Sequence, residues 1–147
     1  MQRDLSFMVD DFHLNVRVGV ILRYEDKTVL EVSRLGLNSV IPGGRIRIGE
    51  SSRDAITREM REEMNISLDE DRLSYVTTLE NFFVYNSVKV HELFFVYSYT
   101  VSDAELEVIN ALSGNMDNET TYFKLVNNGE LEKYDLLPVR LRDIINA

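Results

Sequence analysis

Residues 43–66 read GGRIRIGESSRDAITREMREEMNI, and this stretch contains the most informative pattern of the chain. The segment from Ser51 to Met64 predicts one long helix, because apolar residues recur at helical spacing and a serine can cap the first amides. At about 100° per residue, Glu59, Glu62 and Glu63 fall within one arc of that helix. Three carboxylates so close together repel one another unless a cation compensates them, and oxygen ligands suit Mg²⁺, Mn²⁺ or Ca²⁺.

The neighbouring face of the same helix is apolar. Ile56, Met60 and Met64 would dock the helix on a hydrophobic core, so one side is suited to packing and the other to a metal ion. Arg58 can pair with Glu62 along the helix, or it can cross to another carboxylate and fix that side chain's rotamer.

Two glycines precede the helix. Gly43 and Gly44 remove side chains where a backbone must turn sharply or approach a ligand. A glycine-rich loop that leads into a helix can present free amides to phosphate, although two glycines also suit a plain turn. The acidic helix likewise has a simpler interpretation, a solvated face that balances neighbouring arginines. On these residues alone the simpler interpretations stay open.

The rest of the chain adds strands on both sides of this segment. Strands are predicted at 12–24, 28–33, 73–83, 88–101 and 121–126, with a hairpin connection at 85–87. Residues 34–49 are predicted to be mostly loop, and short helices are expected at 131–134 and 139–145. The order of strands, helix, strands, helix indicates a mixed α/β or α+β sandwich, with a sheet packed between helices.

Length and composition limit the class of protein. The 147 residues suit a single domain, 1–147, and 44% hydrophobic with 28% charged residues is ordinary for a soluble globular chain. No apolar run approaches the ~20 residues that span a bilayer, so no membrane partner is expected. Residues 1–12 lack the apolar core of a signal peptide, and we therefore expect a cytoplasmic protein.

The charge and the cysteine count exclude further classes. The chain has no cysteine, which excludes disulfides, thiolate metal sites and a cysteine nucleophile. Its formal net charge of −9 argues against a DNA or RNA duplex as partner, because such binding needs clustered lysine and arginine. A small molecule that carries phosphate stays possible as a partner, since a cation held by carboxylates can reverse the local field.

The same stretch resembles the Nudix box. That box reads Gly, five residues, Glu, seven residues, Arg-Glu, an apolar residue, any residue, Glu-Glu, any residue, Gly, apolar. Here Gly44 is followed by five residues and Glu50, and seven more lead to Arg58. Every constrained position matches except the last glycine, which is Asn65, a residue that can serve the same helix-ending geometry. The resemblance implies the Nudix-type α/β/α sandwich around a mixed β-sheet.

The resemblance also implies roles for individual residues. Glu59, Glu62 and Glu63 match the family's metal-binding carboxylates, and Glu62 and Glu63 are the strongest candidates for direct coordination and catalysis. Arg58 matches the arginine that orients the glutamates. Gly44 and Glu50 match structural positions of the loop. The cofactor implied is Mg²⁺ or Mn²⁺, and the reaction is hydrolysis of a nucleoside diphosphate linked to another moiety.

A carboxylate outside the box can supply a further ligand or the general base. Glu92 is the first candidate, because charge at the start of an apolar strand, pointing towards the helix, would be expensive without a cation. A His-Glu pair at this strand is common in similar Nudix sequences. Glu80 is the second candidate, and a glutamate of the box itself is the third.

Other functions and several details stay open. One alternative is a Nudix-like module that binds a nucleotide without cleaving it, although such modules usually lack box glutamates that are present here. Another is a metal- or protein-binding domain whose acidic helix is an interface.

The box does not specify whether the substrate is ADP-ribose, a nucleotide sugar, an oxidised nucleoside triphosphate or a dinucleoside polyphosphate. The segments expected to set this choice are 35–40, 80–90 and 103–122. Ser39 replaces an aromatic residue frequent in relatives. The number of metal ions is also open. The oligomeric state is open as well, although a homodimer is common among relatives.

Overall fold

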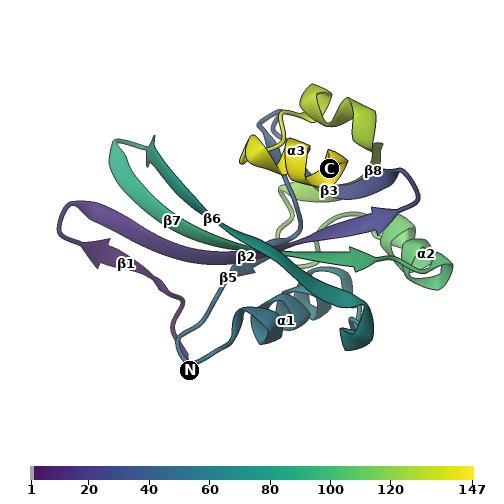
Figure 1. Ribbon diagram of the computed structural model, residues 1–147, viewed down its shortest axis with the longest axis horizontal. Helices are drawn as coiled ribbons and strands as arrows, with labels where there is room; N and C mark the ends of the chain where they lie inside the picture. The colour runs from purple at the N-terminus through teal and green to yellow at the C-terminus, as the bar shows by residue number, and fades with distance from the viewer. Residues whose placement is uncertain (1) are drawn as a thin grey trace.

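A computed structural model describes residues 2–147 as a mixed β-sheet with helices on both faces (Figure 1). The strands are β1 (Ser6–Val9), β2 (Phe12–Tyr24), β3 (Lys27–Ser33), β4 (Ser39–Val40), β5 (Gly43–Arg45), β6 (Leu73–Tyr85), β7 (Val88–Thr100) and β8 (Thr121–Asn127). The helices are α1 (Ser52–Met64), α2 (Asp103–Ala111) and α3 (Arg140–Asn146), with 3₁₀ turns η1 (Glu70–Arg72) and η2 (Asn128–Tyr134).

The two long central strands make the sheet mixed. β2 runs parallel to β7, while the other named strand pairs are antiparallel. The main path is β4-β3-β2-β7-β6, with β1 and β5 also paired to β2 and β8 paired to β3. One edge of β2 is therefore shared by β5, at 17–19, and β3, at 23–24. The sheet divides between these two partners.

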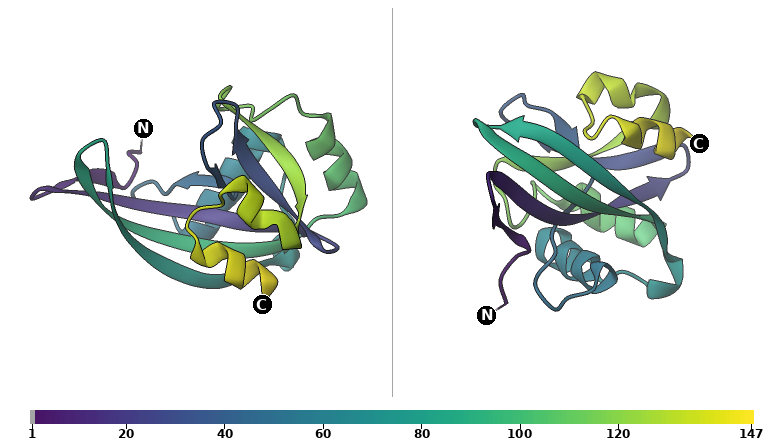
Figure 2. Two further views of the ribbon diagram at one scale, coloured as in Figure 1. Left: turned by 90° about the horizontal axis from the view of Figure 1, so that it is seen from above. Right: turned by 60° about the vertical axis from the view of Figure 1, so that its left-hand side comes forward.

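Each face of the sheet has its own core. Helix α1 covers one face, where its Ile56 and Met60 pack with Val18 and Val20 of β2. The segment η2 and helix α3 cover the other, where Ile21 of β2 belongs to a second buried cluster. This alternation follows from the period of two along a strand. Figures 1 and 2 show α1 and α3 on opposite sides of the sheet, which confirms the predicted sandwich.

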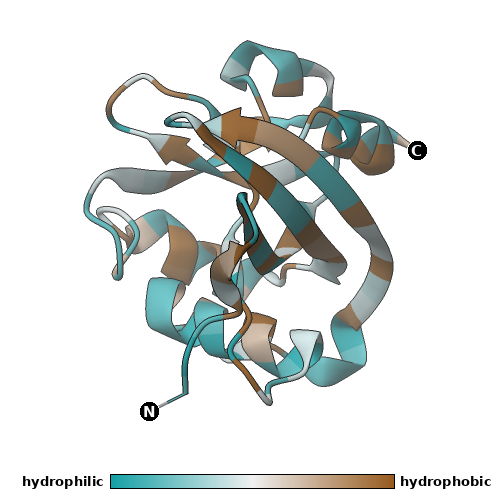
Figure 3. Cartoon of the chain, turned by 90° about the vertical axis from the view of Figure 1, so that its left-hand side faces the viewer, coloured by the Kyte–Doolittle hydropathy of each residue, from teal (hydrophilic) through white to brown (hydrophobic). Residues whose placement is uncertain are grey.

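The predicted helix and hairpin are confirmed. Ser51 precedes α1 as its cap, and its hydroxyl accepts a hydrogen bond from the amide of Asp54 at 3.0 Å. Asn65 ends the helix in the left-handed conformation, with φ at 57°. Asn86 and Ser87 connect β6 to β7 with φ of 49° and 65°, which is the geometry that joins twisted strands tightly. Hydrophobic and hydrophilic bands alternate along the long strands (Figure 3).

One helix and three strands of the structure were not predicted from the sequence: α2, β1, β4 and β5. Helix α2 lies inside the segment 103–122, for which a role in substrate choice was predicted but no secondary structure. Its signal was present, because Ser102 and Glu105 form a capping box at the spacing expected for a helix start. Strand β1 and the short strands β4 and β5 were also missed, since two to four residues carry too little periodicity to be recognised. No helix among residues 2–147 combines the length and the apolar composition needed to cross a membrane.

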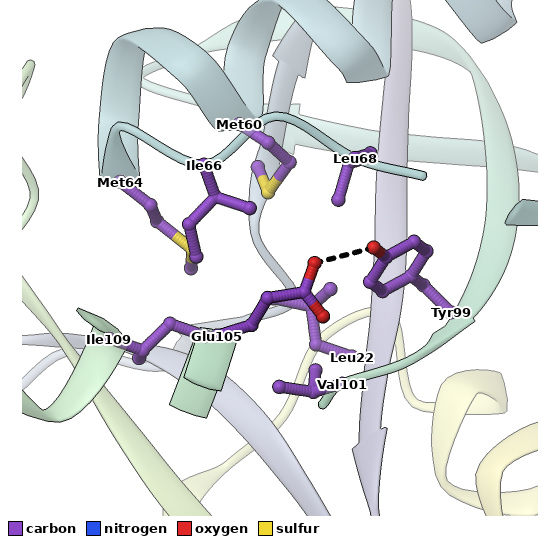
Figure 4. A pocket seen from close by; sticks show the side chains of 9 residues that line it. All are labelled: Leu22, Met60, Met64, Ile66, Leu68, Tyr99, Val101, Glu105 and Ile109. Carbon is purple, nitrogen blue, oxygen red and sulfur yellow. Dashed lines mark hydrogen bonds between the residues drawn. The ribbon is translucent and has the colours of Figure 1, made fainter. Parts of the chain in front are cut away.

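Glu105 also joins α2 to the core beneath α1 (Figure 4). Its carboxylate accepts hydrogen bonds from Tyr99 Oη at 2.6 Å and from Arg72 at 2.7 and 3.2 Å. Burial disfavours the charged form, but the bonds from Arg72, Ser102 and Tyr99 outweigh it and lower the pKa of Glu105 from 4.5 to about 2. This carboxylate therefore stabilises the folded chain as an anion.

Replacing Glu105 by glutamine should lower the free energy of unfolding at pH 7 by about 2 kcal/mol, since it removes charge-assisted hydrogen bonds. Because the folded pKa lies below the ordinary value, the contribution is fully present above pH 4.5 and is lost as the pH falls towards about 2. Urea unfolding of both proteins at pH 7 and pH 2.5 measures it. Glu107→Gln, on the exposed side of α2, is the control. An equal deficit at both pH values would contradict the explanation.

Candidate active site

The glycine pair of β5 allows two close approaches. A Cβ on Gly43 would lie 2.0 Å from the carbonyl oxygen of Val18 and 2.7 Å from the Cα of Gly19. A Cβ on Gly44 would lie 2.4 Å from the carboxylate of Glu59. Gly43 is therefore required for β5 to lie against β2, and Gly44 leaves the space that the carboxylate of Glu59 fills.

Arg58 joins the loop of the box to its helix. Its Nε and Nη2 donate to the two oxygens of Glu50 at 2.8 and 3.0 Å, and its Nη1 donates to Glu59 at 2.9 Å and Glu62 at 3.3 Å. The fourth partner is the carbonyl oxygen of Arg45, at 3.0 Å. Both pairings left open by the sequence are thus present, and the bidentate one is with Glu50. These hydrogen bonds raise the pKa of Arg58 and lower that of Glu50.

Three carboxylates converge beside this arginine. Oxygen atoms of Glu59, Glu62 and Asp117 all lie within 4.8 Å of one another. Glu59 is only 8% exposed, while the other two are exposed. An all-oxygen, anionic set at this spacing fits a hard divalent cation such as Mg²⁺ or Mn²⁺, so these residues are the ones that would hold it.

Asp117 is the member of this group that the sequence did not predict. It lies in the loop between α2 and β8, more than fifty residues beyond the box. No periodicity or motif marks it, because its proximity to Glu59 and Glu62 arises only when the chain folds. The sequence had assigned the segment 103–122 to substrate choice, which placed Asp117 in the right region without a role.

Glu63 lies beside Glu59 but is not one of the three carboxylates of this group. The two glutamates are four residues apart and therefore lie on one face of α1. Glu63 is 5% exposed and accepts a hydrogen bond from Asn115 Nδ2 at 3.1 Å. Burial, and the neighbouring carboxyls of Glu59 and Glu31, raise the pKa of Glu63. A bound cation would have the opposite effect. Direct coordination by Glu63 therefore stays a prediction.

The expected orientation of Glu92 is wrong. Glu92 lies on the same face of β7 as Phe94 and Val96, which pack in the core opposite α1. Its carboxylate accepts a hydrogen bond from Asn81 Nδ2 at 2.9 Å, so a neighbouring amide compensates its burial. Glu80 is exposed on β6. Neither belongs to the group formed by Glu59, Glu62 and Asp117. A catalytic role for Glu92 stays a prediction.

A cleft of about 690 Å³ opens beside the acidic group. Gly43, Gly44, Glu59 and Glu63 line it together with two cations, Arg17 and Arg45, and the aromatic ring of Tyr85. Each segment predicted to set specificity contributes to the wall. These contributions are Leu35, Leu37, Asn38, Val40, Tyr85, Asn115, Asp117, Asn118, Thr120 and Thr121. The volume is in the range of small-molecule sites. The cleft thus offers carboxylates for a metal, arginines for phosphates and a mixed surface for an attached group.

Known proteins share this fold, and a family model matches the sequence. The family model described as NUDIX domain matches residues 13–145. A MutT protein from Bacillus halodurans superimposes with a TM-score of 0.70 at 16% identity, over 90% of this chain and 80% of that chain. An Ap4A hydrolase from C. elegans gives 0.60 at 13% identity, over 90% and 93%. A MutT protein from Methanosarcina mazei Go1 gives 0.60 at 18%, over 95% and 94%.

The acidic helix and the glycine loop that faces it lie beside a cleft lined by carboxylates, arginines and an aromatic residue. Together with the matches above, these features define the class of protein as a hydrolase of phosphoric anhydrides. The chain belongs to the Nudix family. The predictions of family, fold and enzyme class are confirmed. Enzymes of this family generally use divalent metal ions and act on nucleotide-derived small molecules.

Proposed function

We propose that this protein is a pyrophosphohydrolase, dependent on Mg²⁺ or Mn²⁺, that cleaves a nucleoside diphosphate linked to another moiety. The candidate substrates are ADP-ribose, a nucleotide sugar, a nucleoside triphosphate or its oxidised form, and a dinucleoside polyphosphate. The observation that carries the proposal is the convergence of Glu59, Glu62 and Asp117 at the wall of a cleft that also contains two arginines.

The side chains around the cleft have different roles in the proposed hydrolysis. A divalent cation, when bound, neutralises phosphoryl oxygens and makes a water molecule more acidic. Arg17 and Arg45 line the cleft and would attract the diphosphate group. Arg58 fixes the carboxylates of Glu59 and Glu62, so that their positions are set before substrate arrives.

The attacking water must give its proton to a carboxylate. Glu59 and Glu63 line the cleft, whereas Glu80 and Glu92 are not among its lining residues. This favours a glutamate of the box over the two strand residues as general base. We expect Glu63→Gln to lower kcat far more than Glu92→Gln does. If Glu92→Gln lowered kcat more than Glu63→Gln, the general base would instead be the strand residue Glu92.

A panel of nucleoside diphosphate derivatives, incubated with and without Mg²⁺ or Mn²⁺ and resolved by chromatography, tests the proposal. We expect cleavage of at least one member only when metal is present. Glu62→Gln should reduce kcat/KM about tenfold, because it removes one anionic ligand from the acidic group. Glu107→Gln, exposed on α2, should match the wild type.

Two outcomes would oppose this function. Folded protein that binds nucleotides but cleaves no member of the panel would favour the alternative of a non-catalytic nucleotide-binding module. Cleavage that continues after the metal has been removed by chelation would show that the carboxylates do not act through a cation.

A further inference from the structure

The loop between α2 and β8 brings the one carboxylate from outside the box to the acidic group. This loop, residues 112–120, has no regular secondary structure of its own. We infer that Asn115 is a positioning residue that holds this loop against α1 and β3 and thereby sets the position of Asp117. The inference rests on the proposed function only in the use to which Asp117 is put.

The side-chain amide of Asn115 joins two elements. Its Nδ2 donates to Glu63 Oε1 of α1 at 3.1 Å and to Glu31 Oε2 of β3 at 3.2 Å. Asn115 is 7% exposed, and both carboxylates are buried as well. A buried carboxyl without a donor would be costly, so this amide stabilises both acidic neighbours at once.

The other end of the same amide orders the loop. Asn115 Oδ1 accepts a hydrogen bond from the backbone amide of Asp117 at 2.8 Å. The adjacent amide of Met116 donates to the carbonyl oxygen of Glu63 at 2.9 Å. That carbonyl is in the last turn of α1, where helical partners run out. Two successive loop amides are thus fixed directly before the side chain of Asp117.

A side-chain amide at this reach makes all three contacts. Its Nδ2 donates to Glu63 and Glu31, and its Oδ1 accepts from the amide of Asp117. Thr121 Oγ1 is a second donor to Glu31, at 2.8 Å. Alanine supplies neither the amide donor nor the acceptor. The contacts also determine which end of the amide faces which partner. The residue type therefore follows from three hydrogen bonds that connect a strand, the box helix and the loop.

The consequence concerns Asp117 itself. Asp117 is exposed, so packing does not fix its position. Its distance to Glu59 and Glu62 depends on the loop, which the Asn115 amide holds against α1 and β3. Loss of the Asn115 amide should weaken metal binding through Asp117 and not through the box.

A double-mutant cycle on the full chain tests this coupling, with Mn²⁺ affinity measured from the electron paramagnetic resonance signal of the free ion. We expect Asn115→Ala and Asp117→Asn each to weaken Mn²⁺ binding about tenfold. We expect the double variant to be no weaker than Asp117→Asn, because coupled sites are not additive. Additive losses, about a hundredfold in the double variant, would overturn the inference.

Hydrogen exchange of the metal-free protein gives a second measurement. Asn115→Ala should speed exchange at the amides of Met116 and Asp117 about tenfold, and unchanged exchange would overturn the inference. The hydroxyl of an Asn115→Ser variant would replace part of the hydrogen-bond network, so its exchange rates should lie between those of the wild type and of Asn115→Ala. This variant replaces Asn115→Ala in the experiment if the alanine variant does not fold. Asn110→Ala and Glu119→Gln, both exposed, are the matched controls. Neither measurement needs a substrate, so failure of the proposed function would be seen separately.

Discussion

Replacing Arg58 by alanine is expected to lower kcat/KM about 100-fold and the free energy of unfolding by about 3 kcal/mol. Arg58 contacts Glu50, Glu59 and Glu62 together, and only 17% of its side chain is exposed. Its removal leaves a largely buried Glu50 without its bidentate partner and lets the two box carboxylates repel each other. Steady-state kinetics and urea unfolding measure the two effects.

A lysine at position 58 separates charge from geometry. Arg58→Lys keeps the positive charge but lacks the planar fork that spans both oxygens of Glu50, so it should recover part of the stability and little of the activity. Arg61→Ala, on the exposed side of the same helix, is the control and should resemble the wild type. If Arg58→Lys retained full activity, the orienting role would be wrong and the charge alone would suffice.

Replacing Gly44 by alanine is expected to lower kcat/KM about 100-fold while the protein stays folded. The new methyl group would occupy the space of the Glu59 carboxylate, at 2.4 Å. A flexible side chain can move aside, so the cost falls on the position of a functional group more than on stability. Gly43→Ala should do the reverse, because its methyl group would meet the backbone of Val18 and Gly19. We expect it to destabilise the fold by about 3 kcal/mol.

The contrast between the adjacent glycines is the test. Thermal unfolding and kinetics of both variants should show an inactive, stable protein for Gly44→Ala and an unstable one for Gly43→Ala. Gly129→Ala has open space around its added atom and should change neither property. An active Gly44→Ala protein would mean that the position of Glu59 does not limit the reaction.

The box helix could be predicted because its determinants are local. The Ser51 cap, the apolar spacing and the left-handed Asn65 all act within one or two turns of each residue. The same locality fixes the relation of Glu50 to Arg58, since both lie in one continuous segment. The determinants of helix α2 are equally local, because its capping box lies within one turn of the helix start. This helix could therefore also have been predicted from the sequence.

The position of Glu92 could be narrowed but not settled from the sequence. Alternation along β7 places it on the face of Phe94 and Val96. Which face meets α1 depends on the parallel register of β7 with β2, where Glu92 lies opposite Asn15. Register across strands about 75 residues apart is set by packing and not by any local signal, so the orientation towards the helix was wrong.

The box helix, its carboxylates, the flanking strands and the family could be predicted, because each depends on periodicity or on spacing within one segment. The tertiary structure places Glu62 beside Asp117 and gives Glu63 a hydrogen bond from Asn115, which no local pattern predicts. It also decided that three distant segments wall one cleft. These contacts join residues whose approach requires closing loops of about 30 residues or more, and that closure is stabilised only by the packed core.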